Sequence, residues 1–253
     1  MSWEPERYLQ FADERLRPAQ DLLARIPLPA PARVVDLGCG PGNVTRLLAG
    51  RWPQTQITGV DASAAMLERA RTTLPEARFE LADIRHWTPA EAPELIFSNA
   101  ALHWLDDHPA LFPRLLSLLA PGGVLAVQMP GNFDAPSHRQ IRELAAAPAW
   151  AEVLVEARMG AVLSMSDYHH LLAPHCTQLT LWESIYWQAL KGPAPVLDWL
   201  RSTTLLPYLA PLTAADQARL LADLAPKLAD AYPADASGTT LFPFRRIFMV
   251  ACR

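Results

Sequence analysis

The stretch Val34-Val35-Asp36-Leu37-Gly38-Cys39-Gly40-Pro41-Gly42 decides which fold this sequence predicts. A β-branched apolar pair runs into an acidic residue, and three glycines then alternate with other residues. This pattern predicts a buried strand over 33–37 that breaks into a tight loop and opens a helix over 43–51. Glycine lacks a Cβ atom, so the loop can adopt positive φ angles and a ligand can lie against its backbone. The helix start adds unpaired N–H groups and the positive end of the helix dipole.

Strand-like and helical segments alternate after this loop. Such an order predicts crossover connections, and therefore a doubly wound α/β fold whose mostly parallel, seven-stranded sheet carries helices on both faces. The remaining strands are predicted over 56–61, 78–81, 94–99, 124–129, 178–188 and 245–252.

Apolar residues at helical spacing predict the helices. An N-terminal helical region over 5–26 is expected in two pieces, because Arg17-Pro18 restarts the pattern, and Pro226 should kink or divide a later helix. The other helices are predicted over 64–73, 108–119, 137–147, 151–158, 166–172, 196–206 and 213–231.

Polar residues stand at the ends of four of these strands. Each falls at or just after the carboxyl end of a predicted strand: Asp36, Asp61, Asp83 and Asn99. Parallel sheets bind ligands outside this edge, where the strand order reverses. The sequence therefore predicts a ligand site with several polar side chains along one edge of the sheet.

The composition excludes several classes of protein. The 253 residues are 51% hydrophobic and 19% charged, which excludes a disordered chain, and the net charge of -4 argues against a nucleic-acid partner. No apolar segment has the length needed to cross a bilayer, so no membrane partner is expected. Cys39, Cys176 and Cys252 lie far apart, as in proteins of reducing compartments, and the histidine-rich segment 169–176 matches no zinc-ligand spacing. We expect a cytoplasmic protein without a metal, either a monomer or a weak homo-oligomer.

Two kinds of nucleotide cofactor suit a glycine-rich loop after a first strand. A dinucleotide site prefers G-x-G-x-x-G, with an acid about 20 residues later. Here the spacing is G-x-G-x-G, and Asn43 stands where the third glycine should be. Asp36 would repel a pyrophosphate at the helix start, whereas it would attract a ligand with an ammonium group. An NAD-dependent oxidoreductase is therefore the less favoured alternative.

The same motifs resemble those of class I S-adenosylmethionine-dependent methyltransferases, and a closer similarity to the trans-aconitate 2-methyltransferase family extends over nearly the whole chain. The superfamily motifs are Asp36–Gly42, Asp61, Asp83 and Ser98-Asn99-Ala100. The closer similarity is carried by Trp3–Phe11, Arg51-Trp52-Pro53, Leu102–Leu105, Val127–Pro130, Leu197-Asp198-Trp199 and Phe242–Ala251.

The resemblance implies one methyltransferase domain over 1–253 with a Rossmann-like fold. Its parts are then N-terminal helices over the cofactor site (1–30), a cofactor-binding core (31–130), helical cap insertions (131–176 and 191–240) and the final strands (177–188 and 245–252).

The resemblance also implies roles for individual residues. Asp36 would orient the methionine ammonium of S-adenosylmethionine, directly or through water, and Asp61 would accept both ribose hydroxyls. Met66 and Ile84 would flank the adenine, with Asp83 on its exocyclic amine. The full set of predicted cofactor contacts is Tyr8, Phe11, Asp36, Gly38, Cys39, Gly40, Gly42, Asp61, Ala62, Met66, Asp83, Ile84, Asn99 and Ala100.

Cations and hydrogen-bond donors must hold a polycarboxylate acceptor. Arg246 is the first candidate, and Arg245 is the alternative because strand alternation turns only one of the two inward. The secondary candidates are His103, Trp104, Gln128 and Tyr186.

A purely structural role remains an alternative for several of these residues. Tyr8 and Phe11 either cover the site or form an aromatic packing contact. Met66 is as readily a core residue. For the acceptor contacts the alternative is packing at a strand end or exposure to solvent.

The implied reaction transfers a methyl group to a carboxylate of trans-aconitate and leaves a monomethyl ester and S-adenosylhomocysteine. Carboxylic acids have a pKa near ~4, so the nucleophile is already ionised and no catalytic general base is expected. Alignment and exclusion of water are then the tasks of the protein. Two alternatives stay open: another small or acyl-carrier-bound carboxylate as acceptor, such as a malonyl thioester, and a binding module without catalysis.

Overall fold

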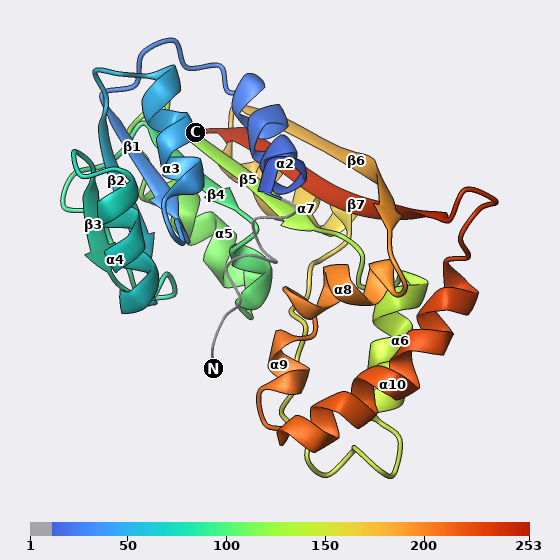
Figure 1. The fold of residues 1–253 in the computed structure, drawn as a ribbon. Coiled ribbons are helices and arrows are strands. Elements are labelled where there is room, and N and C mark those ends of the chain that lie inside the picture. The colour runs from blue at the N-terminus through green and yellow to red at the C-terminus, as the bar shows by residue number, and fades with distance from the viewer. Residues whose placement is uncertain (1–11) are drawn as a thin grey trace. The chain divides into compact units, whose positions relative to one another are not determined.

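The structure, a computed structural model, describes residues 12–253 (Figure 1). The strands are β1 (Arg33–Leu37), β2 (Gln56–Asp61), β3 (Arg78–Leu81), β4 (Leu95–Asn99), β5 (Val124–Pro130), β6 (Gln178–Lys191) and β7 (Thr239–Cys252). The helices are α2 (Ala12–Ala24), α3 (Asn43–Arg51), α4 (Ala64–Thr73), α5 (His108–Ser117), α6 (Pro136–Ala145), α7 (Met165–Leu172), α8 (Pro195–Arg201), α9 (Leu206–Leu209) and α10 (Ala214–Ala231), with 3-10 turns η1 (Leu102–Trp104) and η2 (Ala173–His175).

The sheet has the order β3-β2-β1-β4-β5-β7-β6 within the described residues. Strands β1 to β5 pair in parallel, and β7 pairs antiparallel with β5. The predicted doubly wound, mostly parallel sheet of seven strands is therefore confirmed. The order reverses between β1 and β4, which is where such sheets bind their ligands.

The chain divides into two compact units. The sheet unit comprises Arg15–Pro130, Ala161–Ser184 and Arg246–Arg253, and the helical unit comprises Gly131–Gly160 and Ile185–Arg245. Strands β6 and β7 each contribute residues to both units.

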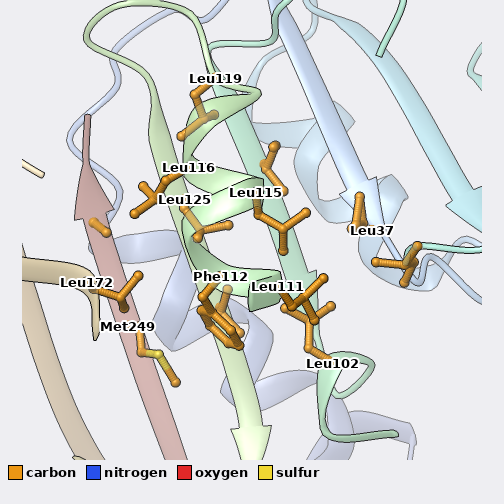
Figure 2. Packing of buried hydrophobic residues seen from close by; sticks show 14 of the residues in the cluster. Leu37, Leu102, Leu111, Phe112, Leu115, Leu116, Leu119, Leu125, Leu172 and Met249 are labelled. Atoms are coloured by element: carbon orange, nitrogen blue, oxygen red, sulfur yellow. The ribbon is translucent and has the colours of Figure 1, made fainter. Parts of the chain in front are cut away.

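The main core of the sheet unit lies between the sheet and the helices α5 and α7. Helix α5 turns Leu111, Phe112 and Leu115 toward the sheet, where they meet Leu125 of β5 (Figure 2). Burying side chains of this size stabilises a fold by roughly 1.5–3 kcal/mol each. This packing holds the strands rigid, so the residues at their carboxyl ends keep fixed positions.

The opposite face of the sheet carries α3 and α2. The Asp36 side chain on β1 reaches Thr45 of α3 on this face. Farther along, the ring of Trp182 on β6 stacks on Phe248 of β7, and the guanidinium of Arg25, just after α2, lies 4.2 Å from the Trp182 centroid. Helices therefore cover both faces, as the alternating pattern predicts.

The helical unit has a core of its own. Helix α10 buries Leu220, Leu224 and Leu228 along one stripe and packs beside α6 and α8. Within residues 12–253, no helix combines the length and apolar character that crossing a membrane would require.

One prediction about proline is wrong, because helix α2 runs through Pro18 without a break. Pro226 also does not divide α10, which is one helix over Ala214–Ala231. A proline removes one backbone donor, but the leucine stripe of α10 on both sides of Pro226 is buried and offsets that loss. In α2, Pro18 itself is buried with Leu22.

Two predicted helices also differ from the structure. Residues 151–156 form turns and 157–158 have no regular structure. Trp150 and Leu154 are buried, whereas the β-branched Val153 and Val155, 53% and 72% exposed, disfavour a helix. The helix predicted over 196–206 is divided into α8 and α9. Between them the Ser202 hydroxyl bonds to the Trp199 carbonyl at 2.9 Å and competes with helical pairing.

The final strand is longer than predicted. Strand β7 begins at Thr239 and not at residue 245, because the Asp235 carboxylate accepts hydrogen bonds from the backbone N–H groups of Ser237 and Thr239 and turns the chain into the strand early. Strand β6 likewise continues to Lys191.

Candidate active site

The glycine loop follows β1 with three positive φ angles. Gly38, Gly40 and Gly42 have φ of 78°, 53° and 85°. A Cβ atom on Gly38 would overlap the Cβ of Ala101, whereas one on Gly40 would meet nothing within 4 Å. Gly38 is therefore required for packing against the turn after β4, and Gly40 leaves its backbone open to a ligand.

Asp36 lies beneath this loop and is 1% exposed. Its Oδ2 atom accepts a hydrogen bond of 2.7 Å from the hydroxyl of Thr45, which is fully buried on α3. Burial raises the pKa of Asp36 to about 7, against the lowering effect of the Thr45 bond and with a further raising contribution from the Asp61 charge. Among the described residues, no positive charge contributes to this pKa, and an ammonium group nearby would stabilise the charged form of the carboxylate.

Asp61 at the end of β2 ties two loops together. Its Oδ2 accepts from the Gly40 N–H at 2.9 Å, and its Oδ1 accepts from the Ser63 N–H, also at 2.9 Å. Each oxygen of a carboxylate has a second lone pair, and this side chain is only partly buried. Two further donors, such as a pair of vicinal hydroxyls, can still be accepted.

The residues around Asp61 complete this side of the loop. Ala62 is exposed, and the half-buried Met66 lies in the first turn of α4, where its N–H donates to the Ser63 hydroxyl at 3.4 Å. Cys39 is buried, and burial, followed by the charges of Asp36 and Asp61, raises the pKa of its thiol. Cys39 is therefore a neutral, unreactive thiol in this site.

Asp83 lies two residues beyond β3 and is engaged by Arg85. The Arg85 Nε and Nη2 atoms donate to Asp83 Oδ2 at 2.9 and 2.5 Å, and these bonds lower the pKa of Asp83 to about 2. Contact with an adenine amine would require this carboxylate to accept one more donor. Ile84 beside it is buried and faces Gly38.

Asn99 is the last residue of β4, and Gln128 lies two residues before the end of β5. They are register partners, so their side chains project from the same face of the sheet. The Asn99 Oδ1 and both amide atoms of Gln128 are buried without a hydrogen-bond partner among residues 12–253. Ala100 follows with a φ of 54°, a left-handed conformation that is uncommon for alanine and typical of functional sites.

Strand register places the main polar residues on one face. Asp36 pairs with Phe97 on β4, Gln128 pairs with Phe248, and Pro130 pairs with Arg246. Because side chains alternate along each strand, the following share one face at the carboxyl edge of β1, β2, β4 and β5 and the facing part of β7: Asp36, Asp61, Asn99, Gln128 and Arg246.

His103 and Trp104 lie on η1, directly after this edge. His103 is 5% exposed, and burial, then the positive charge of Arg246, then His108 lower its pKa to about 3. The imidazole is therefore neutral at pH 7, and the charge of Arg246 contributes to this shift. Trp104 is 47% exposed, with its ring centroid 4.7 Å from that of His103.

The two arginines that open the last segment of β7 have different surroundings. Arg245 belongs to the helical unit, where its Nε donates to the Gly131 carbonyl at 2.7 Å and its N–H donates to Asn132 Oδ1 at 2.7 Å. Arg246 belongs to the sheet unit with the other polar residues of the edge. The register of β7 turns Arg246 to the sheet face that carries Gln128, which favours Arg246 as the ligand-facing arginine.

Three predicted contacts are not part of the described sheet unit. Tyr186 is a half-buried residue of the helical unit. Tyr8 and Phe11 lie outside the described residues. Sequence reasoning missed Thr45, whose buried hydroxyl holds Asp36, and Ala101, against which Gly38 packs. The signal for Thr45 is its position three residues into the helix that follows Gly42.

The described edge fits a cofactor that carries an ammonium, a diol and a polar head group. Gly40 leaves open space, Asp61 retains acceptor capacity, and the buried Asn99 oxygen has no described partner. Among residues 12–253, no group of three or more histidine, cysteine or acidic side chains is placed to hold a metal ion.

The chain is similar to known methyltransferases. A family model described as a methyltransferase domain matches residues 8–176. The chain is 50% identical over 253 residues to the trans-aconitate 2-methyltransferase of Azoarcus sp. (strain BH72), a match that covers 100% of this chain and 99% of that protein. It is 49% identical over 251 residues to the trans-aconitate 2-methyltransferase of Yersinia pestis (strain Pestoides F), which covers 98% of this chain and 97% of that one.

Solved structures share the fold at low sequence identity. The YcgJ protein from Bacillus subtilis superposes with a TM-score of 0.62 at 15% identity, over 93% of this chain and 97% of that one. The phosphoethanolamine N-methyltransferase 2 of Haemonchus contortus, in complex with phosphomonomethylethanolamine and S-adenosylhomocysteine, superposes with a TM-score of 0.55 at 16% identity, over 92% of this chain and 52% of that one.

Proposed function

The chain belongs to the trans-aconitate 2-methyltransferase family, and we propose that it transfers the methyl group of S-adenosylmethionine to a carboxylate of trans-aconitate, forming a monomethyl ester. The relatives that carry this name match the chain over its full length. The resemblance of the sequence motifs to this family supports the same assignment.

One observation carries the proposal within the structure: the Asp61 carboxylate is bound to the Gly40 N–H of the glycine loop. This bond joins the end of β2 to the loop after β1, at the place where the strand order favours a ligand. We assign Asp61 to the ribose hydroxyls, Asp36 to the methionine ammonium, and Asn99 with Ala100 to the methionyl end of the cofactor. The further cofactor contacts are Gly38, Cys39, Gly40, Gly42, Ala62, Met66, Asp83 and Ile84, with Tyr8 and Phe11 from the N-terminal segment.

In this reaction the side chains mainly position the cofactor and the acceptor. S-adenosylmethionine, when bound, supplies an electrophilic methyl group on a sulfonium. The acceptor carboxylate is already ionised, so the protein needs no general base. The rigid edge of the sheet aligns the reactants, and alignment of this kind can contribute roughly 7–11 kcal/mol.

Arg246 is assigned to a carboxylate of the acceptor that does not react. Its charge acts on the neighbouring His103, whose ring stays neutral at pH 7. A guanidinium presents a fork of donors that matches a carboxylate. Trp104 and Tyr186 remain further proposed acceptor contacts.

We place the reaction in the cytoplasm, because free thiols such as Cys39 remain reduced there.

A panel of acids with labelled cofactor tests the proposal. The full-length protein should methylate trans-aconitate well above cis-aconitate, citrate and a malonyl thioester, and the product should be base-labile, as esters are. No transfer to trans-aconitate above a heat-killed control would contradict the narrow assignment. Preference for the malonyl thioester would support the alternative acceptor, and tight NAD binding without a response to S-adenosylhomocysteine would reverse the choice of cofactor.

A further inference from the structure

Gln128 is a buried amide whose burial needs an explanation. The residue is 1% exposed, and neither its Oε1 nor its Nε2 has a hydrogen-bond partner within the described part of the chain. An amide removed from water without partners destabilises a fold, and methionine would fill the same space without that penalty. A side chain that lowers stability in this way points to a role in binding.

The surroundings of Gln128 are those of an acceptor site. Its register partner Asn99 ends β4, and the Asn99 Oδ1 atom also has no described partner. On the other side Gln128 pairs with Phe248, two residues along β7 from Arg246. Diagonal neighbours in a sheet lie about 7–8 Å apart, within reach of long side chains. The Gln128 amide and the Arg246 guanidinium thus belong to diagonal neighbours on one face of the sheet.

These two donors differ in charge. Arg246 is cationic, whereas the Gln128 amide is neutral. His103 is neutral as well, because burial, with the charge of Arg246 as the second cause and His108 as the third, lowers its pKa to about 3. A ligand with several carboxylates would therefore meet one cation from this group together with neutral hydrogen-bonding groups.

The reacting carboxylate and the others need different partners. In the transfer, an oxygen of the carboxylate donates an electron pair to the methyl carbon, the C–S bond breaks with its pair remaining on sulfur, and no proton moves. The carboxylate loses its negative charge on the way to the ester. A guanidinium on that group would stabilise the ground state more than the transition state and would slow the reaction, whereas a neutral amide can orient it without this penalty.

Given the proposed methyl transfer, on which this assignment rests, we infer that the Gln128 amide holds the carboxylate that is methylated, while Arg246 holds one that is not. Gln128 is then a catalytic residue that acts through orientation, and it selects which carboxylate of the acceptor reacts. Asn99, its register partner on β4, contacts the methionyl end of the cofactor.

The test compares Gln128→Met with Gln217→Met. Methionine keeps the size of glutamine and removes its hydrogen bonds. Gln217 is a matched control, because its Nε2 atom already donates to the carbonyls of Leu209 and Leu212 within the helical unit. The full-length protein is measured in each case for kcat and KM with trans-aconitate, for S-adenosylhomocysteine affinity by calorimetry, and for thermal midpoint.

Opposite outcomes are expected for the two variants. Gln128→Met should lose at least 10-fold in kcat, keep its S-adenosylhomocysteine affinity within about twofold, and melt at or above the wild-type midpoint. Gln217→Met should melt lower and keep its kcat. A Gln128→Met enzyme with wild-type kcat overturns the assignment. A parallel fall in S-adenosylhomocysteine affinity also overturns it, because Gln128 would then be a cofactor contact.

Gln128→Glu provides a second route should the methionine variant fold poorly. A buried glutamate has a raised pKa, so the variant should be nearly inactive at pH 8, where its charge repels the acceptor, and should recover as pH falls and the protonated acid donates a hydrogen bond. A pH profile parallel to that of the wild type contradicts the role. Absence of transfer to trans-aconitate by the wild-type protein overturns the proposed function and this inference together, whereas an active wild type with an unaffected Gln128→Met overturns the inference alone.

Discussion

The hydroxyl of Thr45 donates a hydrogen bond of 2.7 Å to Oδ2 of Asp36, and both side chains are buried between α3 and the end of β1. This bond is the main favourable contact of a carboxylate whose pKa burial raises to about 7. Burial therefore destabilises the charged form of Asp36. A cation brought in by a ligand would stabilise that form.

The stability of the free protein should fall as pH rises. Asp36 titrates near 3.8 when unfolded and near 7 when folded, so between these values the folded state binds more protons and the free energy of unfolding decreases by up to about 1.4 kcal/mol per pH unit. Above pH 7 this contribution is constant. Asp36→Asn removes it, so urea unfolding at pH 4.5, 6 and 8 should show a flatter profile for the variant. If the wild type and Asp36→Asn lost stability in parallel with pH, the raised pKa of Asp36 would not be the cause of the pH dependence.

Affinity for S-adenosylhomocysteine should change with pH in the opposite sense. If the ligand ammonium faces Asp36, it favours the charged carboxylate, so affinity should rise from pH 6 to pH 8 as Asp36 loses its proton. Calorimetry at pH 6, 7 and 8 measures this rise. Asp36→Asn should bind more weakly and without this dependence, and an unchanged dependence in the variant would mean that another group titrates.

Removal of the Thr45 hydroxyl should destabilise the protein mainly at high pH. Thr45→Val leaves the buried carboxylate without this donor, and the expected loss is about 1–3 kcal/mol at pH 8, with a smaller loss at pH 5 where Asp36 is protonated. Thr45→Ser retains the hydroxyl and should lose only about 0.8 kcal/mol for the missing methyl group. Denaturant unfolding of both variants at the two pH values checks the difference. No loss for valine at pH 8, with a loss for serine, would show that the hydroxyl bond contributes nothing and that packing alone matters.

Gly38 and Gly50 should respond to alanine in opposite ways. Gly38→Ala combines a φ of 78° with an overlap on Ala101, so a destabilisation of roughly 2–5 kcal/mol is expected. Gly50 lies on α3 with nothing within 4 Å of an added Cβ, and Gly50→Ala should stabilise by about 0.5–1 kcal/mol. Thermal unfolding of Gly38→Ala and Gly50→Ala measures both changes. Equal effects of the two substitutions would contradict the close contact between Gly38 and Ala101.

Asp61→Ala should weaken cofactor binding beyond its effect on the loop. We expect a loss of about 1.5–3 kcal/mol in S-adenosylhomocysteine affinity, because charge-assisted bonds to the ligand disappear. Asp235→Ala is the control, since Asp235 also accepts two backbone N–H groups but lies in the helical unit outside the assigned site. Its affinity should equal that of the wild type. A similar loss in both variants would reduce the role of Asp61 to holding its loop.

Arg246→Gln should raise KM for trans-aconitate at least 10-fold, with a smaller change in kcat and in S-adenosylhomocysteine affinity. Loss of a charge-assisted bond to one carboxylate supports this size of effect. Arg245→Gln should instead lower the thermal midpoint, because Arg245 bonds to the Gly131 carbonyl. Steady-state kinetics and melting of the two variants separate these roles, and a larger KM effect in Arg245→Gln would exchange them.

Much of the architecture follows from local patterns. The alternation of strands and helices from residue 33 to 130 predicts the parallel part of the sheet because each element is specified by its own periodicity and turn residues. Predictions failed where tertiary burial opposes local propensity. Pro226 lies inside one continuous helix, and 151–158 form turns and irregular chain instead of a helix. Local rules contain no term for the contacts that the leucine stripe of α10 makes in the folded protein.

Some features of the site also follow from local sequence, and others depend on the tertiary structure. The sequence by itself determined the glycine loop, the acids at the strand ends and the family, because glycine spacing and strand-end polarity are properties of short segments. Only the tertiary structure decided that Thr45 bonds to Asp36, that Asp83 is held by Arg85 and that Arg246 shares a sheet face with Gln128. These relationships depend on register between strands distant in sequence, where a shift of one residue would turn every side chain to the other face.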